Sequence, residues 1–215
     1  MHFVLTLHSH LPYVLNHGRW PHGSDWLCEA ALDTYLPLLE ALRELDEADT
    51  VSPLTLGITP VLANHLASPA FREEMNALFE QRLKACDEAP YSLVETGDQE
   101  LLPLVDYWRA RFLRLQGIFE EVNGDLLGAF KKYEDVSRLE IISSAATHGF
   151  LPLLARDESI RLQLAVGASE HRRLFGKDPS GCWVPECAYR PEGSWNPIPG
   201  VSNEAFRPGI ESFLA

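Results

Sequence analysis

The sequence predicts an α/β protein built on a parallel sheet. Short apolar runs alternate along the chain with longer segments of helical periodicity, which is the order expected when helices cover a parallel sheet. The first of these runs, residues 3–7, is continuous rather than alternating, as is typical of a strand buried on both faces. Polar residues follow each run, and the carboxyl ends of parallel strands are where such folds place their chemistry.

The first part of the chain predicts two strands and two helices. Residues 3–7 and 54–58 are the apolar runs that predict the strands. Residues 27–45 carry leucines three or four positions apart, which predicts an amphipathic helix. Thr59 and Pro60 supply an N-cap and a first-turn proline, so a helix should begin directly after the second strand.

A helical insertion is expected near residues 69–136. Residues 69–89 predict one helix, and residues 98–122 predict a longer one with an apolar stripe. Residues 123–125, with the sequence Asn-Gly-Asp, should end that helix and cap a shorter one that reaches about residue 133.

The second part of the chain predicts two more strands around one helix. Residues 139–143 and 182–184 are the apolar runs, and residues 157–175 have helical spacing and run into Gly176. Residues 191–208 are rich in proline and glycine and predict a loop.

The last residues predict a chain that is truncated after its fourth strand. Residues 209–215 resemble the first turns of an amphipathic helix without a C-cap. Four parallel strands would also leave sheet edges exposed. We therefore expect residues 1–215 to be the N-terminal part of a longer protein.

The charge disfavours two classes of partner. The chain has 18 Lys and Arg against 31 Asp and Glu, a formal net charge of −13. Nucleic acids and anionic membranes both prefer basic surfaces, so neither is expected as a partner. Neutral substrates such as sugars are unaffected by this charge.

The four cysteines, Cys28, Cys86, Cys182 and Cys187, form no CxxC pair. A zinc site is therefore not expected, and free thiols in a reducing cytoplasm fit best. The N-terminus lacks a basic region and soon reaches polar histidines, which is unlike a signal peptide or a membrane span.

The segment around Glu186 is the strongest candidate for a catalytic site. Glu186 follows the fourth apolar run, has prolines on either side, and lies between Trp183 and Tyr189. A carboxylate that attacks a sugar carbon needs a rigid backbone and an aromatic wall for the sugar ring. The alternative is a solvated loop carboxylate beside a core tryptophan.

Three histidines follow strand ends and should lie near this carboxylate. His8 and His10 come after the first strand, and His148 comes after the third. His8 and His10 alternate on the backbone, so only one can point into the site if the extended conformation persists. A packed or surface histidine and a metal-binding pair are the alternatives for these residues.

Four segments of the chain resemble signatures of glycoside hydrolase family 57, and most closely those of its 1,4-α-glucan branching enzymes. Residues 7–13 (LHSHLPY) resemble the first signature, and residues 181–189 (GCWVPECAY) resemble the segment that bears the nucleophile. Residues 56–62 (LGITPVL) and 140–149 (EIISSAATHG) resemble the branching-enzyme forms of two further segments. The resemblance covers essentially the whole chain.

The resemblance implies a distorted seven-stranded (β/α) barrel, of which this chain would supply the N-terminal four strands. It implies a retaining mechanism without metal or cofactor, in which Glu186 forms a covalent glucosyl-enzyme from an α-1,4-glucan. In a branching enzyme the 6-hydroxyl of an acceptor glucan resolves that intermediate and makes an α-1,6 branch.

The resemblance also implies substrate-binding residues. His8, His10 and His148 would hydrogen-bond sugar hydroxyls. Trp183, Tyr189 and Trp20 are expected to stack on sugar rings for a separate reason, which is that sugar faces pack well on aromatic rings. For the three aromatic residues, packing in the core is the alternative.

The sequence departs from the family pattern after Glu186. The family's acid/base aspartate lies on a later strand, and nothing after Glu186 resembles its motif. We therefore expect this chain to be inactive alone. The alternatives are an α-amylase or a 4-α-glucanotransferase of the same family, or a non-catalytic glucan-binding fragment. A metal-dependent polysaccharide deacetylase is disfavoured because no two histidines lie four positions apart.

Overall fold

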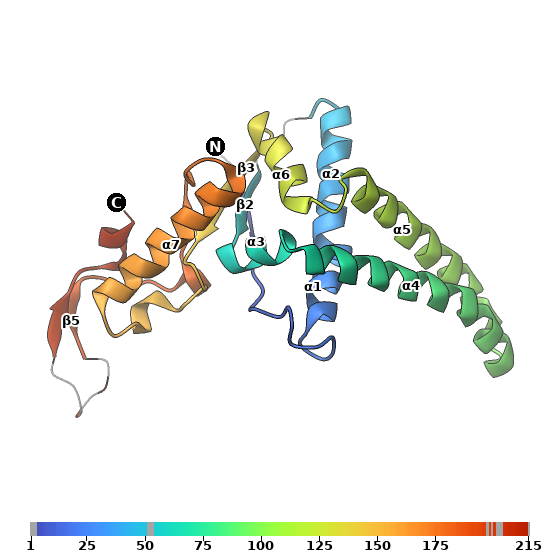
Figure 1. Ribbon diagram of the computed structural model, residues 1–215, viewed down its shortest axis with the longest axis horizontal. Helices are drawn as coiled ribbons and strands as arrows, with labels where there is room; N and C mark the ends of the chain where they lie inside the picture. The colour runs from blue at the N-terminus through green and yellow to red at the C-terminus, as the bar shows by residue number, and fades with distance from the viewer. Residues whose placement is uncertain (1–3, 51–53, 197, 199, 201–203, 215) are drawn as a thin grey trace. The chain divides into compact units, whose positions relative to one another are not determined.

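The structure is a computed structural model that describes residues 4–50, 54–196, 198, 200 and 204–214 (Figure 1). The chain divides into two compact units. The first, called the sheet unit, consists of residues 1–13, 52–64 and 131–215. The second, called the helical unit, consists of residues 14–51 and 65–130.

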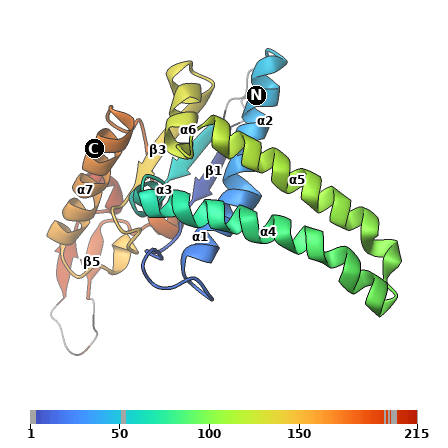
Figure 2. The ribbon, with the colours of Figure 1, turned by 45° about the vertical axis from the view of Figure 1, so that its right-hand side comes forward.

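A four-stranded parallel sheet forms the centre of the sheet unit, as the sequence predicts (Figure 2). Its strands are β1 (Leu5–Ser9), β2 (Leu54–Ile58), β3 (Leu139–Ser144) and β4 (Cys182–Trp183), and they lie in chain order. All three neighbouring pairs are parallel, so the carboxyl ends of the four strands share one edge. The predicted loops after these strands therefore converge.

The prediction that the first strand, β1, is buried on both faces is wrong. Its described residues begin to pair at Leu5, and Phe3 lies outside the described residues. Leu5 and Leu7 are 43 % and 36 % exposed. Within the described chain β1 pairs with β2 alone, and an edge strand has less cover than a central one. In the central strands β2 and β3 the apolar side chains are buried.

The helices that follow β2 and precede β3 begin at their predicted caps. In α3 (Pro60–Leu66), the Thr59 hydroxyl accepts a hydrogen bond from the Leu62 N–H at 3.4 Å. In α6 (Leu126–Asp135), the Asp125 carboxylate accepts one from the Gly128 N–H at 2.9 Å. Each side chain satisfies a backbone donor that the first helical turn leaves unpaired.

Helix α7 (Asp157–Phe175) packs against β3 and ends at Gly176, as predicted (Figure 2). Gly176 has a φ of +79°, the left-handed conformation that favours glycine at a helix end. In the middle of the helix, Gly167 allows a close approach to the sheet. A Cβ at that position would lie 2.2 Å from the Ser144 carbonyl oxygen.

Residues 191–208 form more than the predicted loop. They contain an antiparallel hairpin of β5 (Gly193–Trp195) and β6 (Ala205–Arg207). The Arg207 guanidinium lies 4.4 Å from the centre of the Trp195 ring and donates to the Leu154 carbonyl at 2.7 Å. The contact with Leu154 reaches outside the segment, so the proline and glycine content of residues 191–208 could not predict the hairpin.

Short 3₁₀ turns complete the sheet unit. They are η3 (Leu151–Leu153), η4 (Pro185–Cys187) and η5 (Ile210–Phe213). The segment η5 stands where we predicted the start of an amphipathic helix. Its Ile210 is fully buried against Ala145, Leu151 and Ile160.

The helical unit begins with one long helix that contains a π-helical turn. It comprises α1 (Ser24–Ala30), η1 (Ala31–Tyr35) and α2 (Leu36–Glu47). The helix predicted for residues 27–45 is therefore confirmed. Four of its periodic leucines are buried: Leu32, Leu36, Leu39 and Leu42.

Two further helices, α4 (Pro69–Thr96) and α5 (Leu102–Glu121), run side by side and are joined by the 3₁₀ turn η2 (Gln99–Leu101) (Figure 1). Helix α4 continues past the predicted end at residue 89 and contains Pro90 in its interior. The apolar stripe of α5 is buried at Phe119, but Trp108 on the same stripe is 43 % exposed.

No helix among the described residues is long and apolar enough to cross a membrane.

Candidate active site

A cluster of three histidines lies at the carboxyl edge of the sheet. We call His8, His10 and His148 the histidine cluster. The Nε2 atoms of His8 and His148 are 3.1 Å apart. The ring of His10 stacks on that of His148 at a centroid distance of 4.0 Å. The ring of Trp183, in β4, stacks on the ring of His8 at a centroid distance of 4.7 Å.

His8 and His10 both contact His148, although side chains that alternate along an extended strand would let only one of them point into the site. The reason is local, because β1 ends at Ser9 and His10 already lies outside the extended strand. The Nδ1 atom of His10 is 3.1 Å from the Thr59 hydroxyl. Thr59 therefore serves two purposes, since the same oxygen caps α3.

Glu186 is presented by a backbone conformation that is unusual for its residue type. It lies in η4 with φ +56° and ψ +21°, and Cys187 follows with φ +52°. His148 also has a positive φ, +55°. Left-handed conformations cost free energy in residues that have a Cβ, and they concentrate at functional sites. Three of them meet at this edge of the sheet.

The turn that carries Glu186 is held by two backbone hydrogen bonds. The Cys187 N–H donates to the Val184 carbonyl at 2.9 Å, and the Ala188 N–H donates to the Pro185 carbonyl at 3.0 Å. The Glu186 side chain is 66 % exposed, and its Oε1 lies 3.6 Å from Nδ1 of His148. The backbone of Glu186 is thus held in place, while its carboxylate is open to a ligand and next to an imidazole.

Burial makes the paired histidines poor bases. Desolvation, with a smaller contribution from His148, lowers the pKa of His8 from 6.5 to about 4. Desolvation also lowers the pKa of His148, and the nearby Glu186 carboxylate opposes that shift. Both imidazoles are therefore neutral at neutral pH, and each offers one N–H donor and one acceptor.

Gly57 belongs to the site, although we singled out its neighbours Thr59 and Pro60 instead. It is the register partner of His8 across β1 and β2. A Cβ at residue 57 would lie 3.1 Å from Nδ1 of His8, tighter than an ordinary van der Waals contact. The signal that could have found Gly57 is its position in a strand that otherwise carries only Leu, Thr and Ile.

The sequence profile described as glycosyl hydrolase family 57 matches residues 4–215. The chain belongs to glycoside hydrolase family 57. The family predicted from the four signature segments is thereby confirmed.

Relatives of this family 57 chain include branching enzymes. The chain is 38 % identical over 213 residues to the 1,4-alpha-glucan branching enzyme of Thermococcus kodakarensis, covering 99 % of the chain and 30 % of that protein. The crystal structure of a GH57-type branching enzyme from Pyrococcus horikoshii matches with a TM-score of 0.92 and 39 % identity, over 98 % of the chain and 39 % of that structure.

An alpha-amylase also resembles the chain. The crystal structure of AmyC from Thermotoga maritima matches with a TM-score of 0.76 and 31 % identity, over 88 % of the chain and 36 % of that structure. The chain thus spans about a third of the length of these relatives. The predicted fold class is confirmed, because the four parallel strands match the N-terminal portion of the family's barrel.

The remaining predicted site residues of this family 57 chain lie in different surroundings. Tyr189 is 60 % exposed, and its hydroxyl donates a hydrogen bond to Glu211, which raises the pKa of that hydroxyl. Trp20 belongs to the helical unit and is 78 % exposed. Their roles, and those of the histidine cluster and Trp183, stay predictions.

No group of three His, Cys, Asp or Glu side chains within the described ranges has a geometry that could hold a metal ion. All four cysteines are free. Burial raises the pKa of the Cys182 thiol to about 11, so this thiol is protonated at neutral pH.

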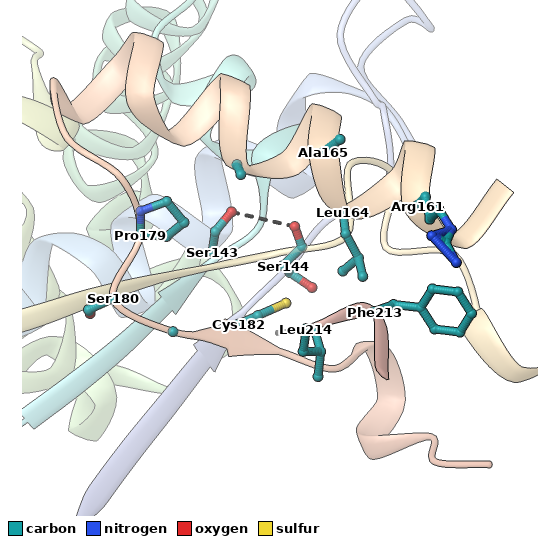
Figure 3. A pocket seen from close by; sticks show the side chains of 12 residues that line it. Ser143, Ser144, Arg161, Leu164, Ala165, Pro179, Ser180, Cys182, Phe213 and Leu214 are labelled. Carbon is teal, nitrogen blue, oxygen red and sulfur yellow. Dashed lines mark hydrogen bonds between the residues drawn. The ribbon is translucent and has the colours of Figure 1, made fainter. Parts of the chain in front are cut away.

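A separate cavity of about 470 Å³ lies between α7, the end of β3, the start of β4 and η5 (Figure 3). Its wall is largely apolar, with Leu164 pointing into it and the Phe213 ring beside Arg161 at one end (Figure 3). Its serines are already engaged, since Ser143 donates to the Gly167 carbonyl at 3.3 Å and Ser144 donates to the Trp183 carbonyl at 2.7 Å. None of the predicted site residues lines this cavity.

Proposed function

We propose that this chain is the nucleophile-bearing part of a retaining α-glucan transglycosidase, a 1,4-α-glucan branching enzyme. The observation that carries the proposal is the Glu186 carboxylate, which stands on a left-handed turn at the end of β4 with His148 at 3.6 Å. The branching enzymes among the relatives, at 38 % and 39 % identity, support the choice of reaction.

In the proposed reaction, a Glu186 oxygen attacks the anomeric carbon of an α-1,4-linked glucose. The bond from that carbon to the leaving oxygen breaks, and an acid/base carboxyl group gives the leaving oxygen a proton. The 6-hydroxyl of an acceptor chain then attacks the anomeric carbon, displaces Glu186, and returns a proton to the same acid/base. Retaining enzymes place the two carboxyl groups about 5–5.5 Å apart.

We place the acid/base on a further part of the barrel, outside residues 1–215. The chain alone should then bind glucan without turning it over at the rate of the complete enzyme, because a positioned acid/base is worth about 10²–10⁴ in rate. The histidine cluster would donate hydrogen bonds to sugar hydroxyls. Trp183, Tyr189 and Trp20 would offer apolar ring faces to the sugars.

We place the protein in the cytoplasm, where its four free thiols would stay reduced. Since no metal or cofactor enters the proposed steps, a chelator should leave the activity unchanged.

The test is a Glu186→Gln substitution in the full-length protein, with Glu192→Gln as the matched control. Glu192 is an exposed carboxylate six positions further along the same segment. With amylose as substrate, Glu186→Gln should abolish branch formation, read as new chain ends after debranching, and the control should keep it. A Glu186→Gln enzyme that still forms branches would refute the assignment.

An α-amylase is the second candidate, supported by the match to AmyC. The same incubation separates the two. Branching leaves the number of reducing ends unchanged because each cleavage is followed by transfer, whereas hydrolysis raises it with every cleavage. A rise in reducing ends without new branches would favour the amylase.

A further inference from the structure

The contact between the partly buried His8 and the buried His148 constrains the protons of both rings. The Nε2 atoms of His8 and His148 are 3.1 Å apart. A hydrogen bond between two ring nitrogens needs an N–H on one and a lone pair on the other. Two neutral imidazoles joined in this way must therefore be opposite tautomers, and two arrangements are possible.

In the first arrangement, His8 carries its proton on Nε2 and donates to His148. His148 then carries its own proton on Nδ1, the atom that lies 3.6 Å from the Glu186 carboxylate. In the second arrangement, His148 donates from Nε2, and its bare Nδ1 lone pair faces the negative carboxylate. Only the first arrangement makes the contact with Glu186 attractive.

The other ring nitrogen of His8, Nδ1, also favours the first arrangement. This atom is buried and has no hydrogen-bond partner among the described residues. In the second arrangement that atom would carry a buried N–H without an acceptor, which is rare and costly in folded proteins. In the first arrangement it carries only a lone pair. The lowered pKa values of both rings support the neutral forms that this reasoning assumes.

We propose that His8 is a positioning residue that holds His148 in the Nδ1–H tautomer, with that N–H directed at Glu186, and that Gly57 provides the space His8 needs. The proposal rests on the proposed function only where it takes Glu186 as the nucleophile. Trp183 stacks on His8 and His10 stacks on His148, so each ring is also held from one face. Glu186 is the charged group that faces the pair.

Gly57 allows a test that leaves the histidines in place. A Cβ at residue 57 would press on Nδ1 of His8 at 3.1 Å and displace its ring relative to His148. The matched control is Gly181→Ala, because the new Cβ would meet a side-chain carbon of Ile142 at a similar 3.0 Å. Both variants crowd the same sheet, and only one of them crowds His8.

The experiment measures imidazole ¹⁵N chemical shifts in the full-length protein labelled at histidine, without substrate and at neutral pH. Protonated and bare ring nitrogens have well-separated shifts. We expect His148 to be protonated at Nδ1 and bare at Nε2, and His8 to show the reverse. His8→Phe, which keeps a ring on Trp183 but removes the donor, should change the tautomer population of His148.

Kinetics supply the second readout. Gly57→Ala should lower kcat on the order of tenfold with little change in KM, because a displacement of a few tenths of an ångström misorients the reacting group. Gly181→Ala should stay within about twofold of the parent kcat, an experimental margin well below the effect expected from misorientation. Circular dichroism would verify that both variants are folded.

Two results would overturn the proposal: a proton on Nε2 of His148 in the parent protein, or the same shifts and kcat in Gly57→Ala as in Gly181→Ala. The first result is independent of the proposed function, because it needs no substrate and no activity. If Glu186→Gln remained active while the shifts showed the expected tautomers, the nucleophile would be refuted and the tautomer assignment would stand.

Discussion

Substituting Gly167 by alanine should destabilise the protein, although alanine is the better helix former. The new Cβ would lie 2.2 Å from the Ser144 carbonyl oxygen, and ordinary contacts begin at 3.4 Å. The obstacle is sheet backbone, which cannot rotate away like a side chain. Helix α7 would have to move off β3 by about an ångström, and overpacking of this kind costs about 1–3 kcal/mol.

The higher helix propensity of alanine offsets part of this cost. A second glycine, at a helical position without a clash, measures the propensity gain by itself. Gly117 lies inside α5, and a Cβ there would meet no atom within 4 Å. Gly117→Ala should therefore gain the full propensity difference of about 1 kcal/mol. The difference between the two variants isolates the cost of the clash.

The assay is thermal unfolding followed by circular dichroism. For a protein of this size, about 1 kcal/mol corresponds to roughly 2–4 °C in Tm. Gly117→Ala should raise Tm and Gly167→Ala should lower it. If both variants raised Tm equally, the close packing of α7 on β3 would be refuted.

Three further predictions concern the site and its supports. Thr59→Ala should cost about 1 kcal/mol by removing the cap of α3, and Thr59→Ser should restore it in urea unfolding; equal stabilities would contradict the cap. Arg207→Met should destabilise the β5–β6 hairpin, because Arg207 is 5 % exposed and pairs with Asp157; unchanged proteolysis of the hairpin would contradict this. Stability should fall as the pH drops from about 6.5 towards 4. In this range His8 of the unfolded chain binds a proton, whereas His8 of the folded chain, with its lowered pKa, stays neutral. His8→Gln should flatten that part of the stability curve, and an unaltered slope would show that His8 is not responsible.

The fold could be predicted where residues that start or end a helix or strand lie next to the boundary in the sequence. The strand at residues 54–58 was predicted at its observed bounds because Thr59 and Pro60 end it and start a helix. The end of α7 was predicted because Gly176 supplies a left-handed residue. Local side chains determine these boundaries, and one sequence is enough to find them.

The rest depends on partners that are distant in the chain. The β5–β6 hairpin is held by Arg207, whose carboxylate partner lies 50 residues earlier. The place of Gly57 in the site follows from strand register, which sets it beside His8, and periodicity contains no information about register. The left-handed backbone of Glu186 was not predicted either, because glutamate does not favour that conformation.

The pairing of His8 with His148 also affects how the protein is made. The two residues lie 140 positions apart. At about 5–20 residues per second, a ribosome needs roughly 7–28 s to extend the chain from one to the other. During that interval β1 can already pair with β2, but the histidine cluster stays incomplete until His148 has been made. The histidine cluster is therefore completed late in the synthesis of this chain, well after β1 and β2 can pair.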